Sequence, residues 1–400
     1  MPKAATMKAP NALRTGAELD RVAGTTRELR IALAGGGTGG HIVPGLHLLA
    51  GVEEDIARPV DVVWFTSGRA VEDRVLGAAR EALALTPFER VTLPIEPRGG
   101  GAPSRTGLVL RTPSAVLRAR ERLIAHRSDV VVGLGGFTSL PVVLAARSSK
   151  IPVVLLEVNA HEGAATRWLS RFAARVLHAW RATLPAGEDS VNRFVGPPLS
   201  PSFAAHAALD DGARELAARA ARLALGLDPE LPVLVVLGGS QGSSALNTFV
   251  RENLGAFQRS GLQVLHQTGP EKIREAGPEC SGYRALEYFD DVQGALMAAT
   301  IALVRGGAST LAEVAALRVP AFVAPYPGHA DKHQEKNAAQ LGVGVVIVQD
   351  SELNAGARDE ILLLSRATSS SRRSSMRAAL AAAVPTDSTR RIWREIVDVI

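Results

Sequence analysis

Short β-branched runs alternate with Ala- and Leu-rich helical segments along most of the chain. The runs that we expect to form strands are Ile31–Ala34, Val60–Phe65, Val130–Gly133, Val153–Leu156, Val233–Leu237, Gln263–His266, Ile301–Val304, Ala321–Ala324 and Gly344–Val348. The segments with helical spacing between them are Gly45–Ile56, Val71–Leu83, Ser114–Ala125, Leu140–Ser148, Ala164–Ala174 and Thr310–Leu317. Such alternation with continuously apolar strands is typical of parallel sheets covered by helices on both faces. The sequence therefore predicts an α/β protein.

The alternation is interrupted once, near the middle of the chain. Three prolines fall within Pro197–Pro201, and neither a helix nor a central strand can continue through them. On each side of this linker a strand runs into a glycine-rich turn and then a helix, and 400 residues exceed one ordinary domain. We therefore expect two Rossmann-like domains whose parallel sheets face each other across a cleft. The expected parts are a mobile N-terminal extension (1–28), a first domain (29–197), a second domain (198–380) and a C-terminal helix that packs back on the first domain (381–400).

Composition excludes several classes of protein. A single cysteine, Cys280, rules out a disulfide scaffold and fits a reducing compartment. The chain has no apolar stretch of membrane-spanning length, and its start has no long apolar core of the kind that a secretory signal needs. A net charge of +5 suits phosphorylated ligands or an anionic membrane surface. Because only 4% of the residues are aromatic, little is available for base stacking, and nucleic acid is not an expected partner.

The first glycine loop, Gly35–Gly40, has the pattern G-x-G-x-x-G between a strand and a helix. Glycines let a ligand approach the backbone, and free N–H groups at a helix start attract phosphate oxygens. A dinucleotide site also needs an acidic residue at the end of the second strand. Here that strand, Val60–Phe65, runs into Thr66-Ser67-Gly68-Arg69, so NAD or FAD binding is disfavoured.

The second glycine loop, Gly238–Gly242, is not followed by the Gly-Lys-Ser/Thr of a nucleotide triphosphatase. Either loop alone could be a tight turn without a ligand, but two equivalent loops in the two halves favour a shared cleft. Metal sites are not indicated either, since His161-Glu162 has no second histidine at zinc spacing and no D-x-D pair occurs. A bound diphosphate would have to be held by backbone amides, hydroxyls and arginines.

Polar side chains gather again between residues 304 and 337. Ala308, Ser309 and Thr310 begin a helix after a strand and a glycine turn, which makes another N-terminus suited to phosphate. Glu313 follows and has two alternative roles: a capping-box carboxylate, or an acceptor of two hydrogen bonds from a ribose diol. His333, Gln334 and Asn337 start the next helix, and the set together is typical of a sugar-binding rim.

The segments GGGTGGHIVPG, GLGGFTSLPVVLAA, IPVVLLEVNA, GGSQGSSALN, HQTG, YFDD, RGGASTLAEVAALRVP and DKHQEKNA occur in this order. Together they resemble the MurG family, the N-acetylglucosaminyltransferases of peptidoglycan lipid intermediates. The resemblance implies a GT-B fold and inverting transfer of GlcNAc from UDP-GlcNAc to the C4 hydroxyl of undecaprenyl-diphospho-N-acetylmuramoyl-pentapeptide (lipid I), which gives lipid II. It also implies peripheral attachment to the cytoplasmic face of the cell membrane, anionic lipid and other cell-wall synthesis proteins as partners, and no metal or other cofactor.

Matching of motifs assigns site residues by this resemblance. The acceptor-facing loop would comprise Gly36, Gly37, Thr38, Gly39, Gly40 and His41, with Gly135 and Gly136 beside it to cradle the lipid diphosphate. The donor contacts would be Asn159 to the sugar, Ser240 to the diphosphate, the Phe289 backbone to uracil, Ala308, Ser309 and Thr310 to the phosphates, Glu313 to ribose, and Gln334 and Asn337 to the GlcNAc hydroxyls.

Two segments depart from the family pattern. Val158 stands where the family commonly has glutamine, and Ser200 stands where its linker carries an arginine. Arg193 and Arg305 are candidate replacements for that arginine.

Inverting transfer requires a base for the acceptor hydroxyl, since a sugar hydroxyl hardly ionises at pH 7. His41 is the leading candidate, because imidazole titrates near neutrality; the alternative is that His41 orients the loop or binds the acceptor diphosphate. Glu157 is the second candidate base, and its alternative is to cap neighbouring amides. The helix N-termini after Leu237 and Gly307 would stabilise the departing diphosphate.

Membrane contact is expected from the first domain, where apolar and basic residues are interleaved. The residues concerned are Leu108, Val109, Leu110, Leu117, Leu123 and Ile124, with Arg105, Arg111, Arg118, Arg120 and Arg122. A basic amphipathic surface can lie on anionic headgroups, whereas an ordinary helix would bury the same apolar face. Three other functions stay open: a non-catalytic GT-B scaffold, a transferase for another donor or a glycolipid acceptor, and, least favoured, a nicotinamide oxidoreductase.

Overall fold

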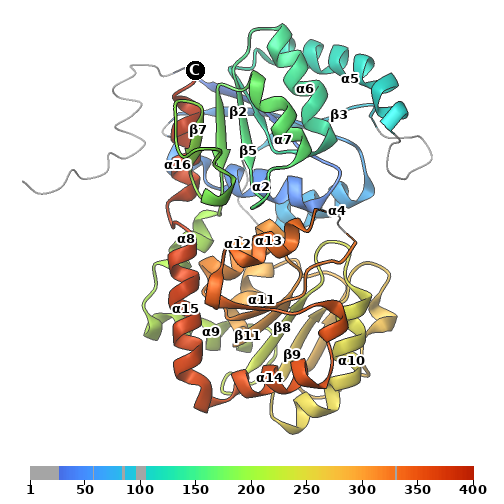
Figure 1. Ribbon diagram of the computed structural model, residues 1–400, viewed down its shortest axis with the longest axis vertical. Coiled ribbons are helices and arrows are strands. Elements are labelled where there is room, and N and C mark those ends of the chain that lie inside the picture. Colours follow the sequence, from blue (N-terminus) through green and yellow to red (C-terminus); the bar gives the residue numbers. More distant parts are fainter. Residues whose placement is uncertain (1–26, 57, 83–85, 96–104, 329–330) are drawn as a thin grey trace, which may run out of the picture.

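The computed structural model describes residues 27–56, 58–82, 86–95, 105–328 and 331–400 (Figure 1). Most of the N-terminal extension expected over residues 1–28 thus lies outside the described residues. Two bodies, one above the other in Figure 1, each contain a parallel sheet with helices on both faces, which confirms the predicted α/β class with two Rossmann-like domains.

The first sheet has seven parallel strands in the order β3-β2-β1-β4-β5-β6-β7. Their bounds are β1 Leu29–Ala34, β2 Val60–Thr66, β3 Phe88–Thr92, β4 Val130–Gly133, β5 Val153–Glu157, β6 Arg175–His178 and β7 Asn192–Phe194. The helices of this half are α2 Gly39–Ala50, α3 Val52–Asp55, α4 Ala70–Ala82, α5 Arg105–His126, α6 Gly136–Ser148 and α7 Ala164–Leu169.

Alternate residues of each central strand enter different hydrophobic clusters, as the two-residue period of a strand requires. In β1, Ile31 and Leu33 face the side covered by α2, while Ala32 and Ala34 face the side covered by α5 and α6. Both faces are thus buried, which explains why these strands are apolar throughout.

The second sheet has six parallel strands in the order β10-β9-β8-β11-β12-β13. Their bounds are β8 Val233–Leu237, β9 Gln263–Gln267, β10 Tyr283–Leu286, β11 Ile301–Val304, β12 Ala321–Val323 and β13 Val345–Ile347. The helices are α8 Pro201–Ala207, α9 Asp211–Ala224, α10 Ser244–Arg259, α11 Val292–Ala298, α12 Ala308–Ala316, α13 His333–Ala339, α14 Ala355–Ser365 and α15 Ser370–Ala383. Residues 195–200 connect β7 to α8 and therefore run between the two halves.

The last helix, α16 (Ser388–Val397), returns to the first half (Figure 1). Its Ile392, Trp393 and Ile396 belong to the same hydrophobic cluster as β1 and α2, and the indole N–H of Trp393 donates to the carbonyl oxygen of Leu48. The chain consequently crosses between the halves a second time near Pro385.

Several expected elements differ from the structure. The strands β3, β6, β7 and β10 were not predicted; β3, β7 and β10 lie at sheet edges, where polar residues replace the apolar pattern. The helix predicted from Gly45 already starts at Gly39, because Pro44 is tolerated inside α2. The helix predicted to reach Ala174 ends at Leu169 and is followed by a single 3₁₀ turn.

The structure of helix α5 shows that part of the expected membrane surface is wrong. Leu123 is fully buried and packs in the core of the first domain, so it is not available to a lipid surface. In contrast, Leu110, Leu117 and Ile124 are exposed by 80%, 68% and 50%. The side chains of residues 105–109 are outside the described part of the structure. Among the described helices, none combines the length and the apolar character that a membrane span requires.

Candidate active site

His41 lies in the first turn of α2, at the carboxyl-terminal edge of the first sheet. Its Nδ1 lies 3.1 Å from Oγ1 of Thr38. Gly135 and Gly136 have φ angles of +92° and +74°, and a Cβ on Gly136 would lie 2.9 Å from the same Nδ1. The Gly135-Gly136 turn therefore packs directly against the imidazole of His41, and a side chain at either glycine would displace the ring.

The surroundings of His41 favour its neutral form. Burial lowers the pKa of the imidazole, and the nearby His333 of the second domain lowers it further. The charge of Glu157 and a hydrogen bond with the backbone of Gly36 act in the opposite direction, but the net shift of the pKa is downward from 6.5. A neutral imidazole at pH 7 can accept a proton, as a general base must.

Glu72 was not singled out from the sequence, yet it organises the first glycine loop. Its carboxylate is fully buried and accepts hydrogen bonds from the N–H of Gly37 at 2.6 Å, the N–H of Ser67 at 2.9 Å and the N–H of Gly68 at 2.7 Å. Burial alone would raise the pKa of Glu72, but these hydrogen bonds together hold it below its usual value. Arg90 also pairs with it at 2.8 Å.

This arrangement makes one amide of the acceptor-facing loop, that of Gly37, unavailable to the acceptor diphosphate. The N–H of Gly37 is already bonded to a carboxylate, and a Cβ on Gly36 would lie 2.5 Å from the same Glu72 oxygen. Thr38 and Gly40 are exposed and stay accessible. Glu72 lies in the first turn of α4, three residues beyond Arg69, and therefore past the strand end at which a dinucleotide enzyme carries its acid.

Glu157 ends β5 and is buried, with its carboxylate turned back onto the following loop. Oε1 accepts the backbone N–H of Asn159 at 3.0 Å, and Oε2 accepts the N–H of Gly163 at 2.8 Å. Glu157 therefore caps neighbouring amides, which is the alternative to a role as base. Its charge also raises the pKa of His41.

Asn337 of α13 joins the two domains. Its Oδ1 accepts the N–H of Ala160 at 2.7 Å, while its Nδ2 donates to Oδ1 of Asn159 at 3.2 Å and to the carbonyl oxygen of Gly306 at 3.1 Å. Asn337 is fully buried and both of its amide hydrogens are engaged. The expected contact of Asn337 with a sugar does not fit this arrangement, whereas Asn159 is only half-buried.

Glu313 forms a second link between the domains. Its Oε1 lies 3.2 Å from Nε2 of His47 in α2, and both side chains are at least nine-tenths buried. No side chain caps α12, so the capping-box alternative for Glu313 is wrong. Helices α2 and α12 pack together here, and Ala308 lies in the hydrophobic cluster of the first domain rather than on an open surface.

The loops of the second domain face the start of α2. A Cβ on Gly39 would lie 3.2 Å from Oγ of Ser240, so the two glycine loops meet. Gln267, which the sequence did not single out, accepts the Phe289 N–H at 3.0 Å and donates to the Gly239 carbonyl at 3.2 Å. Phe289 is buried, and its backbone N–H is thus engaged within the protein.

Near the start of α12, the hydroxyls of Ser309 and Thr310 and the side-chain amide of Gln334 are candidates to contact a ligand. Oγ of Ser309 is buried without a hydrogen-bond partner among the described residues, and Thr310 is half-buried. Oε1 of Gln334 accepts the N–H groups of Gly306 and Tyr326, at 3.1 and 2.9 Å, which leaves its Nε2 for a ligand. Within the described residues no cluster of three or more His, Cys, Asp or Glu could hold a metal ion.

Residues 31–178 match the glycosyltransferase family 28 N-terminal domain, and residues 233–382 match the corresponding C-terminal domain. A protein of Paenarthrobacter aurescens, 36% identical over 340 residues (83% of this chain and 86% of the relative), is named UDP-N-acetylglucosamine–N-acetylmuramyl-(pentapeptide) pyrophosphoryl-undecaprenol N-acetylglucosamine transferase. A Nocardioides protein of the same name is 34% identical over 386 residues, 93% of this chain and 98% of its own. The chain belongs to the MurG family.

Solved structures agree on the fold. Acinetobacter baumannii MurG has a TM-score of 0.63 at 23% identity and covers 93% of this chain and 99% of its own. The calicheamicin glycosyltransferase CalG4 has a TM-score of 0.62 at 17% identity, with 93% and 99% covered. At these identities the likeness shows the GT-B fold alone, and this fold confirms the architecture expected for the MurG family.

The two arginines considered as replacements in the MurG-family linker are engaged elsewhere. Arg305 bonds Oγ of Ser243 at 2.6 Å and Oδ2 of Asp350 at 3.0 Å. Arg193 lies 3.7 Å from the carboxylate of Glu395 in α16. Both guanidiniums thus lie beside carboxylates of the protein itself.

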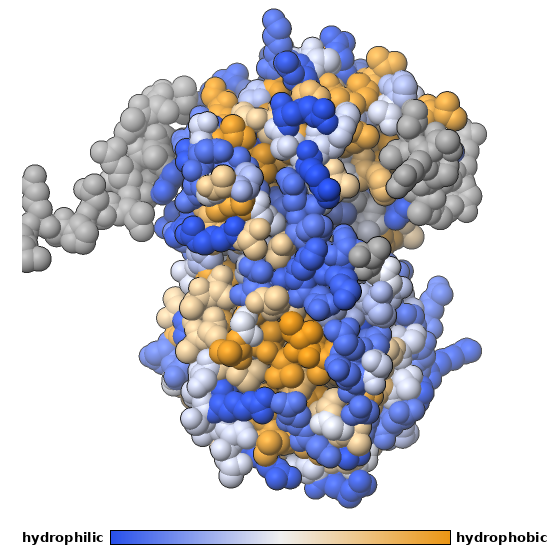
Figure 2. Space-filling view, in the orientation of Figure 1, coloured by the Kyte–Doolittle hydropathy of each residue, from blue (hydrophilic) through white to orange (hydrophobic). Residues whose placement is uncertain are grey.

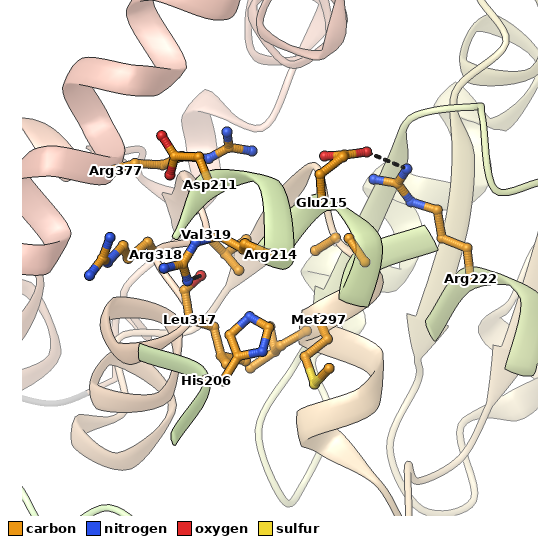
Figure 3. A pocket seen from close by; sticks show the side chains of 13 residues that line it. His206, Asp211, Arg214, Glu215, Arg222, Met297, Leu317, Arg318, Val319 and Arg377 are labelled. Atoms are coloured by element: carbon orange, nitrogen blue, oxygen red, sulfur yellow. Dashed lines mark hydrogen bonds and ion pairs between the residues drawn. The ribbon is translucent and has the colours of Figure 1, made fainter. Parts of the chain in front are cut away.

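A pocket in the second domain lies apart from these residues and is lined by His206, Arg214, Arg318 and Arg377 (Figure 3). The carbonyls of Leu209 and Ala207 accept hydrogen bonds from Arg214 and Arg318, respectively, at 2.7 and 2.8 Å. These arginines satisfy helix ends, and none of the site residues expected for the MurG family lines this pocket.

Proposed function

We propose that this member of the MurG family moves GlcNAc from UDP-GlcNAc to the C4 hydroxyl of lipid I and so forms lipid II. The observation that carries the proposal is His41, whose pKa is lowered by burial and whose imidazole lies against Gly135 and Gly136, close to the place where the glycine loops of the two domains meet. The names of relatives that are 36% identical to this chain over the aligned residues support the same reaction.

His41 is the general base in this proposal. As the C4 oxygen attacks the anomeric carbon of GlcNAc, its hydroxyl proton passes to a ring nitrogen of His41. The bond between the anomeric carbon and the β-phosphate oxygen breaks, and its electron pair leaves with UDP. Attack opposite to the leaving group inverts the anomeric centre. Glu157 stabilises the imidazolium through its charge, because its own oxygens are occupied by backbone N–H groups.

The leaving diphosphate is placed at the N-termini of α10 and α12. Helix N-termini carry partial positive charge and stabilise developing negative charge without reorganisation. Ser240, Thr310 and the unpartnered Oγ of Ser309 supply hydroxyl donors there. This arrangement requires no metal ion.

The remaining site residues bind the sugar and the nucleoside of the donor. Glu313 accepts the ribose hydroxyls, the Phe289 backbone meets uracil through its carbonyl, and Gln334 with Asn159 contacts GlcNAc. Asn337 acts through Asn159, whose amide it holds in place.

We further propose peripheral attachment to the cytoplasmic face of the membrane through α5. The exposed side chains of Leu110, Leu117 and Ile124 recur every seven residues, so they form one stripe along the helix. Arg118 and Arg120 are exposed beside it, and apolar side chains interrupt the polar surface over α5 in Figure 2. A basic amphipathic surface of this kind binds anionic headgroups. Other cell-wall synthesis proteins would then meet the enzyme at the membrane.

A coupled assay of UDP release tests the function. The enzyme is given UDP-GlcNAc and a short-prenyl analogue of lipid I, with UDP-GalNAc and UDP-Glc as competing donors. We expect acceptor-dependent UDP release with UDP-GlcNAc and much slower release with the others. Binding of UDP-GlcNAc without turnover would instead indicate a non-catalytic GT-B scaffold.

A further inference from the structure

The contact between His47 and Glu313 connects the domains at the carboxylate assigned to ribose. The two residues are 266 positions apart, in α2 and α12, and their side chains are 5% and 10% exposed. A carboxylate buried to this degree is costly unless a donor satisfies it. Among the described residues, Nε2 of His47 is the hydrogen-bonding partner of Glu313.

The linker fixes which nitrogen of His47 carries the hydrogen. The backbone N–H of Ser200 donates to Nδ1 of His47 at 3.1 Å. A nitrogen that accepts this bond carries no hydrogen of its own, so in the neutral ring Nε2–H donates to Glu313. The network of hydrogen bonds therefore assigns the tautomer and the direction of the contact.

The position of Ser200 is itself held. Leu199, the residue before it, both donates its N–H to Oγ1 of Thr389 at 2.9 Å and accepts from that hydroxyl at 2.6 Å. The His47 ring lies edge-on to Phe203 of α8, with ring centroids 5.6 Å apart. The imidazole is thus fixed from α2, from the linker and from α8.

This contact leaves hydrogen-bond acceptor sites of the Glu313 carboxylate unused. A carboxylate offers about four acceptor sites, and His47 uses one of them on Oε1. No described residue hydrogen-bonds Oε2 of Glu313. Two ribose hydroxyls can therefore be accepted while the bond from His47 persists.

We infer that His47 is a positioning residue: its Nε2–H orients the Glu313 carboxylate toward the ribose of the donor and so makes donor recognition depend on the first domain. The inference rests on the proposed function. His47 touches neither the sugar nor the reacting atoms, and acts through Glu313.

The test compares His47→Leu and His47→Gln in the full-length enzyme, with UDP-GlcNAc and its 2′-deoxyuridine analogue as donors. His206→Leu is the matched control, since it removes another buried imidazole, from α8, that has no hydrogen bond to Glu313 among the described residues. We expect His47→Leu to raise the KM for UDP-GlcNAc about tenfold, with kcat changed less than twofold, since a hydrogen bond to a charged group is lost. Its preference for the ribose donor over the deoxyribose donor should shrink toward unity.

His47→Gln keeps an N–H donor and should retain most of that preference, and His206→Leu should retain all of it. An unchanged preference in His47→Leu would overturn the inference, even if the KM or the stability changed. If the wild type does not transfer GlcNAc at all, the proposed function fails instead. Calorimetric binding of UDP and 2′-deoxy-UDP then tests His47 by itself, with the same expected loss of preference.

Discussion

The side-chain amide of Asn337 donates to the side-chain oxygen of Asn159 at 3.2 Å, across the boundary between the two sheets. The same Asn337 also binds the backbone of Ala160 and Gly306. One buried amide therefore holds a residue assigned to the sugar in the first domain and the loop that starts α12 in the second.

Asn337→Ala should lower both stability and turnover. It removes three hydrogen bonds and leaves the buried N–H of Ala160 without its partner, which together cost about 3 kcal/mol. Thermal unfolding should show a lower Tm, and kcat should fall because Asn159 is no longer held. Lys336→Ala, at an exposed position of the same helix, is the control and should change neither. An unaltered Tm in Asn337→Ala would mean that these bonds do not hold the domains together.

Gly136→Ala should impair catalysis more than folding. A Cβ there would lie 2.9 Å from Nδ1 of His41, and the φ of +74° is itself unfavourable for alanine by about 1 kcal/mol. Gly187→Ala introduces the same kind of backbone strain at φ +100°, with open space around the new methyl group. We expect kcat to drop at least tenfold in Gly136→Ala and to stay unchanged in Gly187→Ala. Equal kcat values in both variants would show that Gly136 does not seat the imidazole.

The acid side of the pH profile should follow His41. Burial lowers the pKa of His41 in the folded enzyme, so the neutral base persists below pH 6.5. We expect kcat to be independent of pH near neutrality and to fall, as acid is added, only through a pKa below 6.5. A kcat that already halves above pH 7 on the acid side would contradict the environment described for this imidazole.

Membrane attachment should depend on the exposed stripe of α5. Replacing Leu110, Leu117 and Ile124 together by serine should strongly reduce sedimentation with vesicles that contain phosphatidylglycerol. The matched control replaces Leu216 and Leu223 of α9, which are exposed by 69% and 62% in the second domain. If vesicle binding survives in the α5 variant and is lost in the α9 variant, the membrane contact lies on the second domain and the proposal for α5 is contradicted.

The sequence predicted the central strands because apolar runs such as Val233–Leu237 are buried on both faces. It could not reveal β7, whose Asn192-Arg193-Phe194 lies at an edge and carries no apolar pattern. The glycine loops and His41 were visible because their chemistry is local in sequence. Contacts such as that of His47 with Glu313 were not, since they join residues 266 positions apart and arise only from the packing of α2 on α12.

Glu72 shows the same limit at short range. A dinucleotide enzyme carries a carboxylate at the end of β2, and this sequence has none there. The carboxylate instead comes from the first turn of α4 and binds the N–H of Gly37 itself. Sequence spacing alone does not distinguish an acid that binds a ligand from one that accepts a hydrogen bond from a backbone amide of the glycine loop.

The most direct measurement is the single-turnover rate of GlcNAc transfer from UDP-GlcNAc to a lipid I analogue by wild type and His41→Gln. His126→Gln is the control. Its imidazole bonds Ser128 just before β4 begins, whereas Gly135 and Gly136, which contact His41, follow the end of that strand. We predict a rate 10²- to 10⁴-fold lower in His41→Gln, as expected for loss of a general base, with UDP affinity nearly unchanged and His126→Gln like wild type. A wild-type rate in His41→Gln would contradict the account.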